Sequence, residues 1–145
     1  MSSDSIKLVL APNETGLVAG MQVTNTGTAP AELEITGEGP VLHEQQVIDE
    51  KDAITPALRM YYAIMNIYKE PATFADQYRP FLAMAKEMVK QVPSTGPFIA
   101  EIGDNLLDGH FRRALDSCMD LLAYEDALMK QLAEAGEPDP KKSVE

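Results

Sequence analysis

Residues 55–70, with the sequence TPALRMYYAIMNIYKE, form the only helix-like segment of the chain with apolar side chains on two faces. At about 100° per residue, one face carries Leu58, Tyr61, Tyr62 and Met65, and the opposite face carries Met60, Ile64 and Ile67. A helix that is apolar on both sides must be covered on both sides, so we expect it at the centre of the domain. Thr55 and Pro56 are suited to its start, and Pro71 to its end.

Length and composition point to one ordinary soluble domain. The chain has 145 residues, which is long enough for a hydrophobic core without a metal or a disulfide. Cys118 is the only cysteine, so no intramolecular disulfide can form. No apolar run approaches the roughly 20 residues of a membrane span, and the N-terminus lacks the pattern of a signal peptide. We therefore expect a cytoplasmic protein.

The formal net charge of −11 argues against general affinity for nucleic acid or anionic membranes. Residues 1–50 hold one basic and eight acidic residues, whereas residues 51–135 hold nine basic and twelve acidic ones. Any surface for a polyanion should therefore lie in the second half.

The first half has the pattern of β-strands. Short alternating or apolar runs at 6–10, 17–18, 21–25, 31–35, 41–42 and 47–48 are separated by Gly, Pro and Asn. We expect a small antiparallel sheet packed on the central helix, with inward-facing side chains of Leu8, Val23, Leu33 and Ile35.

The second half has helical spacing. We expect helices over 73–92, with Pro80 as a kink or a true first turn, over 98–106, closed by Gly109, and over 111–135. The predicted fold class is α+β, with a small N-terminal antiparallel β-sheet packed on a C-terminal bundle of about four α-helices. Residues 1–135 would form one domain, with a β part at 5–50 and a helical part at 53–135. The tail at 136–145 is predicted to be disordered.

The sequence offers little for catalysis. His43, His110 and Cys118 fall in no metal-ligand spacing, and no glycine-rich loop resembles a nucleotide-binding motif. Cys118 lies on an apolar helical stripe, which is typical of a core residue. We therefore expect no enzyme, no cofactor and no metal.

Basic side chains in the second half are candidates for RNA binding. Arg79, Lys86 and Lys90 share one helical direction, and Arg112 and Arg113 form a basic pair. The full candidate set is Lys51, Arg59, Arg79, Lys86, Lys90, Arg112 and Arg113. The alternative is an ordinary solvated helix face. Stacking on bases by Tyr61, Tyr62 or Tyr68 is a weaker hypothesis than a place in the core.

The chain holds eight methionines, which suit tolerant binding surfaces as well as cores. Met60, Met84 and Met88 are the candidates for contact with a partner helix. The alternative is that they fill the core.

Three stretches resemble the FlbT family of flagellin-synthesis regulators. They are the opening strand and turn at 6–14, the segment PVLHEQQVIDEKDAITPALRMYYAIMNIYKE at 40–70, and the G-(F/Y)-x-x-AL…L-x-YE pattern at 109–125. The resemblance covers about residues 6–132. It implies a post-transcriptional repressor of flagellin synthesis that associates with the 5′ untranslated region of flagellin mRNA and limits its translation or lifetime.

The same resemblance implies two protein partners, a FlaF-like protein and flagellin. An alternative function follows, in which the chain is an adaptor or chaperone for these proteins and the effect on mRNA is indirect. The strands ending in GPVLHEQQVI are also similar to those of the carbon-storage regulator CsrA, a β dimer that binds mRNA leaders, which would favour a homodimer through the β part.

Overall fold

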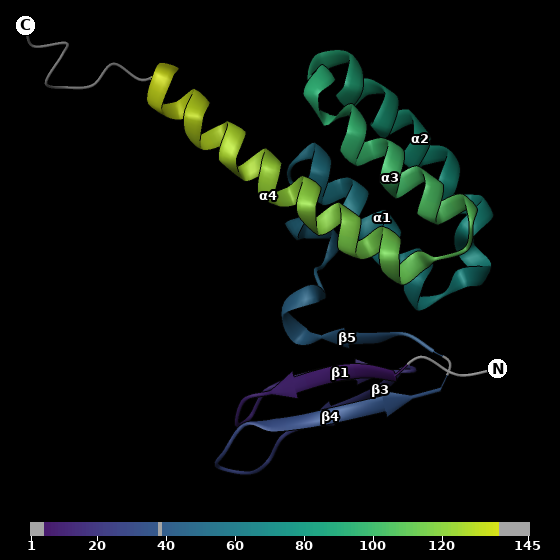
Figure 1. Ribbon diagram of the computed structural model, residues 1–145, viewed down its shortest axis with the longest axis vertical. Helices are drawn as coiled ribbons and strands as arrows, with labels where there is room; N and C mark the ends of the chain where they lie inside the picture. The colour runs from purple at the N-terminus through teal and green to yellow at the C-terminus, as the bar shows by residue number, and fades with distance from the viewer. Residues whose placement is uncertain (1–4, 38, 137–145) are drawn as a thin grey trace, which may run out of the picture.

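The computed structural model describes residues 5–37 and 39–136. Five strands come first: β1 (Ser5–Leu10), β2 (Thr15–Val18), β3 (Met21–Thr24), β4 (Ala31–Thr36) and β5 (Val41–His43). Four helices follow: α1 (Pro56–Lys69), α2 (Phe74–Gln91), α3 (Gly96–Leu107) and α4 (Phe111–Gly136). The strands gather at one end of the molecule and the helices at the other (Figure 1). The predicted α+β class is confirmed.

The strands form two small antiparallel sheets instead of the single expected one. β1 pairs with β4, and β2 lies between β3 and β5. Leu8, Leu10 and Val41 form a small core, against which Val23, Leu33, Ile35 and other side chains pack, so the predicted inward face is confirmed. A Cβ on Gly16 would lie 2.9 Å from Leu8 Cδ2 and 3.2 Å from the Leu42 carbonyl oxygen, so a larger residue there would displace Leu8 within the small core.

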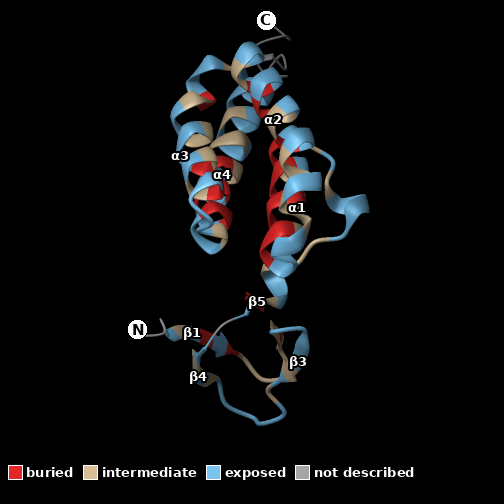
Figure 2. Cartoon of the chain, turned by 90° about the vertical axis from the view of Figure 1, so that its right-hand side faces the viewer, coloured by how far each residue is buried: buried red, intermediate tan, exposed pale blue. Residues whose placement is uncertain are grey.

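Helix α1 is the central helix, as its two apolar faces predict. Eight of its residues are buried: Ala57, Met60, Tyr61, Ala63, Ile64, Met65, Ile67 and Tyr68. α2 and α4 pack against it (Figure 1), and the buried residues gather along the inner sides of the helices (Figure 2). At its start, the Thr55 hydroxyl accepts a hydrogen bond from Leu58 N at 3.2 Å and Pro56 is the first helical residue.

The sheets do not lie over α1 as a layer. Contact runs through β5 and the turn that follows it, where two tyrosines of α1 bind the backbone. Tyr68 Oη accepts a hydrogen bond from Val41 N at 2.8 Å, and Tyr61 Oη donates one to the Gln46 carbonyl at 2.6 Å. Leu42 belongs to the helical core. Tyr61 and Tyr68 are therefore core residues, 3% and 8% exposed, and do not offer their rings to bases.

The remaining expectations differ in detail. α2 begins at Phe74, so Pro80 lies inside the helix, where it removes one backbone hydrogen bond, and not in its first turn. Residues 47–48 pair with no strand and lie between two 3-10 turns. Gly109 follows α3 with φ +80, a left-handed conformation that suits glycine, as expected. Apart from Gly136, which ends α4, the predicted disordered tail lies outside the described residues.

Candidate functional site

The seven candidate cations are all exposed but do not form one patch. Arg79, Lys86 and Lys90 lie along one face of α2, and none of them is in an ion pair with another described residue. From the helical rise, they are spaced about 10 Å and 6 Å apart along the axis. We call this row of three cations, Arg79, Lys86 and Lys90, the α2 stripe.

Three of the other four candidates, Arg113, Lys51 and Arg59, lie near carboxylates. Arg113 lines a shallow depression with three carboxylates, those of Glu101, Asp116 and Asp120. Lys51 lies in a 3-10 turn between Glu50 and Asp52. Arg59 is on α1, at the edge of a groove described below. These positions are less suited to a phosphate than the α2 stripe, because neighbouring carboxylates oppose an anion.

An aromatic ladder lies at the start of α2 and was missed by the sequence analysis. Phe74 stacks on Tyr78 with ring centroids 5.0 Å apart, and on Phe111 of α4 at 5.7 Å. All three rings are half-buried. Arg79 and Arg112 directly follow two of these rings in sequence. The spacing of Phe74 and Tyr78 by one helical turn was the available signal, but the approach of Phe111 depends on tertiary packing.

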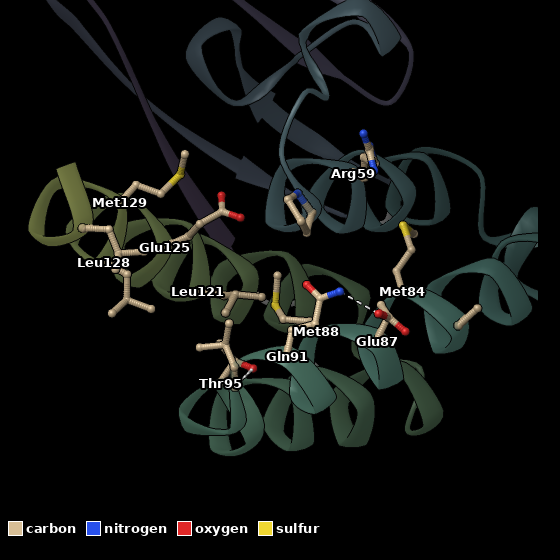
Figure 3. Close-up of a pocket in the computed structure, with 14 residues that line it drawn as sticks. Arg59, Met84, Glu87, Met88, Gln91, Thr95, Leu121, Glu125, Leu128 and Met129 are labelled. Carbon is tan, nitrogen blue, oxygen red and sulfur yellow. Dashed lines mark hydrogen bonds between the residues drawn. The ribbon is translucent and has the colours of Figure 1, made fainter. Parts of the chain in front are cut away.

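An apolar groove of about 680 Å³ lies between the start of α1, the second half of α2 and the second half of α4 (Figure 3). Its apolar lining includes Met84, Met88, Leu121, Leu128, Met129 and Leu132. Of the three methionines proposed for partner contact, Met84 is half-buried and lines the groove, whereas Met88 contributes to the groove lining but is only 7% exposed and belongs to the helical core. Met60 does not line the groove: it is 0% exposed, so its assignment to a partner site is wrong and it is a core residue between packed helices.

Most polar groups around this groove already have partners inside the chain. The Glu125 carboxylate accepts hydrogen bonds from Thr55 Oγ1 at 2.6 Å and from Ala57 N at 3.1 Å. Gln91 donates to Glu87 at 2.6 Å. Glu125 thereby supplies negative charge to the N-terminus of α1, where the helix dipole favours it. The groove therefore presents mainly an apolar surface, with Arg59 as its one cation among the lining residues.

His43 and Cys118 make contacts that are typical of residues with a structural role. His43 Nε2 lies 3.0 Å from Glu14 Oε1, and His43 Nδ1 accepts a hydrogen bond from Gln45 N. The hydrogen bond from the Ala11 amide and the contact with His43 hold the pKa of Glu14 below its ordinary value. Cys118 is 0% exposed, and burial raises the pKa of its thiol, so it is unsuited to act as a nucleophile.

Two features are absent from the described residues. Within residues 5–37 and 39–136, no three His, Cys, Asp or Glu side chains are grouped so that they could hold a metal ion. In the same part of the chain, no helix has the length and apolar character needed to cross a membrane.

Comparison with known proteins gives one consistent result. A protein of Bradyrhizobium diazoefficiens named "Probable flagellum biosynthesis repressor protein FlbT 1" is 35% identical over 128 residues, which cover 88% of this chain and 86% of that protein. Proteins of Rhodopseudomonas palustris and of a Caulobacter species, both named "Probable flagellum biosynthesis repressor protein FlbT", are each 28% identical and cover 87% and 83% of this chain, and 98% and 93% of their own lengths. No solved structure matches.

The sequence profile described as "Flagellar protein FlbT" matches residues 6–129. This range contains all five strands apart from Ser5, the first three helices and most of α4. The match therefore extends through both the β part and the helical part, and the chain belongs to the FlbT family of flagellar proteins.

Proposed function

We propose that the chain is a cytoplasmic, non-enzymatic repressor of flagellum biogenesis that acts on flagellin mRNA through its 5′ untranslated region. Membership of the FlbT family and the repressor names of the relatives support the regulatory part of this proposal. The single observation that carries the RNA contact is the exposed α2 stripe of Arg79, Lys86 and Lys90, next to the aromatic ladder.

The physical argument combines charge and stacking. Single-stranded RNA is bound by cations that follow the phosphates and by aromatic rings on which bases stack. The α2 stripe supplies the cations in a row, and Tyr78, half-buried and about 100° around the helix from Arg79, supplies a ring at one end of that row. In a chain of net charge −11, a local site of this kind is the one way to bind RNA, because the overall field repels it.

The experiment is direct binding of the purified chain to a labelled flagellin leader RNA and to a shuffled RNA, at low and at physiological salt. We expect selective binding of the leader that survives physiological salt. Arg79→Glu with Lys86→Glu should weaken binding of all RNAs and make the slope of log affinity against log salt shallower by about 1.4, or about 0.7 for each lost phosphate contact. Lys7→Glu with Lys69→Glu is the matched control, because it changes the net charge equally at two exposed cations outside the stripe.

Tyr78→Leu separates base stacking from charge, since leucine keeps an apolar side chain but has no ring. Loss of one stacked base should weaken leader binding by about 1 to 3 kcal/mol with the salt slope unchanged. Equal loss in the stripe variant and in its control would mean that only overall charge matters, which contradicts the proposal. Absence of RNA binding, while the chain captures flagellin or a FlaF-like protein, would favour the adaptor alternative instead.

A further inference from the structure

Helix α4 is much longer than the helix that precedes it and pairs with it. It has 26 residues, whereas α3 has 12, and its second half projects away from the bundle (Figure 1). Along this half, Met129 and Leu132 are 52% and 68% exposed, and both line the apolar groove. The projecting half of α4 is thus one wall of a groove that no other described segment covers.

The part of the chain outside the structure is unsuited to fill this groove. Residues 137–145, EPDPKKSVE, follow α4 directly and contain one apolar residue other than proline, Val144. Asp126, Lys130 and Glu134 of the projecting half lie by helical spacing on the side of α4 away from Leu128 and Leu132, whereas Glu125 lines the groove and is hydrogen-bonded to Thr55 and Ala57. The groove therefore suits an apolar helix face whose charged side chains either point away from the contact or are already paired within their own chain.

The projecting half of α4 is itself such a face. Its apolar stripe from Leu121 to Leu132 spans about 16 Å, and the α2 wall of the groove from Ala83 to Gln91 spans about 12 Å. Figure 3 shows Leu128 and Met129 at one end of the groove, and Met84 with Arg59 at the other. A two-fold axis through the middle of the groove would bring the α4 stripe of each copy onto the Met84 end of the other, which is an isologous contact.

Charge at the two ends agrees with this arrangement. The last turn of α4 contains no basic residue, so the negative end of its helix dipole has no cation in that turn. Arg59 is exposed at the opposite end of the groove and is in no ion pair with another described residue. The same two-fold axis brings Arg59 of each copy toward the α4 end of the other copy.

We propose that the chain forms a homodimer in which the second half of α4 from each copy docks into the apolar groove of the other. This interface differs from the β-part dimer expected from the likeness to CsrA. In this dimer, each copy covers the exposed Met129 and Leu132 of its partner. The cation of each groove would also lie against the negatively charged helix end of the other copy.

The test is the molar mass of the full chain in solution, measured by light scattering and sedimentation equilibrium over a concentration series. We expect a wild-type dimer. Leu132→Asp should raise the dimer dissociation constant by about 100-fold or more, because it places a carboxylate in an apolar contact. Leu107→Asp is the matched control: Leu107 is 64% exposed, on α3 and outside the groove, and this variant should stay dimeric.

A charge reversal sharpens the test. Arg59→Glu should weaken the dimer, because it would place a carboxylate near the negative end of the α4 helix of the other copy. Three results would overturn the proposal: a wild-type monomer at every concentration, a Leu132→Asp variant that stays dimeric, or a monomer that uses Leu132 to hold flagellin or a FlaF-like protein. RNA binding is measured separately on the same variants, so failure of the dimer is distinguishable from failure of the proposed function.

Discussion

The helical part and the β part of this chain are both organised around buried apolar side chains, but on very different scales. The helical core contains seventeen buried residues, whereas the small core between the sheets contains three, Leu8, Leu10 and Val41. Hydrophobic stabilisation grows with the apolar area removed from water, so the helical part should carry most of the free energy of unfolding. The β part depends on its connection to α1 for its place and for part of its stability.

The largest effect should come from the centre of the larger core. Ile64 is 0% exposed in the middle of α1, and Ile64→Ala should lower the free energy of unfolding by about 2 to 5 kcal/mol. Leu10 is also 0% exposed, but Leu10→Ala should cost about 2 kcal/mol, at the low end of that range, because its small cluster can close around the gap.

Hydrogen exchange distinguishes the two variants more clearly than a melting curve. Ile64→Ala should speed amide exchange in the helices and the strands together, whereas Leu10→Ala should speed it in the strands alone. Faster exchange of the helices in Leu10→Ala would show that the two parts unfold as one unit, and the comparison of the two cores would then be wrong.

A second, smaller effect concerns the start of α1. The Glu125 carboxylate binds both Thr55 and Ala57, and Glu125→Ala should cost about 1 to 3 kcal/mol, because the buried backbone donor loses its partner. Asp126→Ala is the control, since Asp126 makes an exposed ion pair with Lys130 one turn along the same helix, which is worth at most about 0.5 kcal/mol. Urea denaturation measures the stability of both variants. Equal losses of stability in Glu125→Ala and Asp126→Ala would show that Glu125 does not stabilise the start of α1.

The smallest effect tests the connection between the two parts and depends on pH. Burial, with lesser contributions from Cys118 and Asp116, raises the pKa of Tyr61 from 10.0 to about 12. The folded state therefore favours the neutral phenol, so its contribution is complete below pH 10 and is lost as the pH rises toward 12. Stability measured by urea denaturation should fall across this window in the wild type and fall less in Tyr61→Phe.

At neutral pH, Tyr61→Phe should cost about 1 to 2 kcal/mol, because the Gln46 carbonyl loses its hydrogen-bond donor. Tyr62→Phe is the matched control, since the Tyr62 hydroxyl has no hydrogen-bond partner among the described residues. If stability falls by the same amount at alkaline pH in both variants and in the wild type, a group other than Tyr61 is responsible for the pH dependence.

Local patterns in the sequence predicted the elements well, and tertiary arrangement less well. The two apolar faces of residues 55–70 predicted a central helix, because burial on both sides follows from the spacing alone. Strand positions were also readable, but the division into two sheets was not. It depends on which strands pair, and that is decided by contacts between distant residues such as Leu17 and Leu42.

The candidate site shows the same limit. Spacing correctly placed Arg79, Lys86 and Lys90 on one face, since a single helix fixes their directions. Spacing did not show that Arg113 lies among carboxylates, nor that Met60 is buried while Met84 is not, because these depend on which helices meet. One signal in the sequence could have indicated the groove. The apolar stripe of the last predicted helix, 111–135, is longer than the preceding helix, 98–106, so the preceding helix cannot cover all of it.

The bond between Glu125 and the start of α1 has a consequence for synthesis on the ribosome. The two partners, Thr55 and Glu125, are 70 residues apart in the sequence. At bacterial elongation rates, roughly 4 to 14 seconds pass between the synthesis of Thr55 and the synthesis of Glu125. During that interval the apolar face of α1 that packs on α4 has no partner in the nascent chain, so we expect a co-translational chaperone to bind this face until α4 has been made.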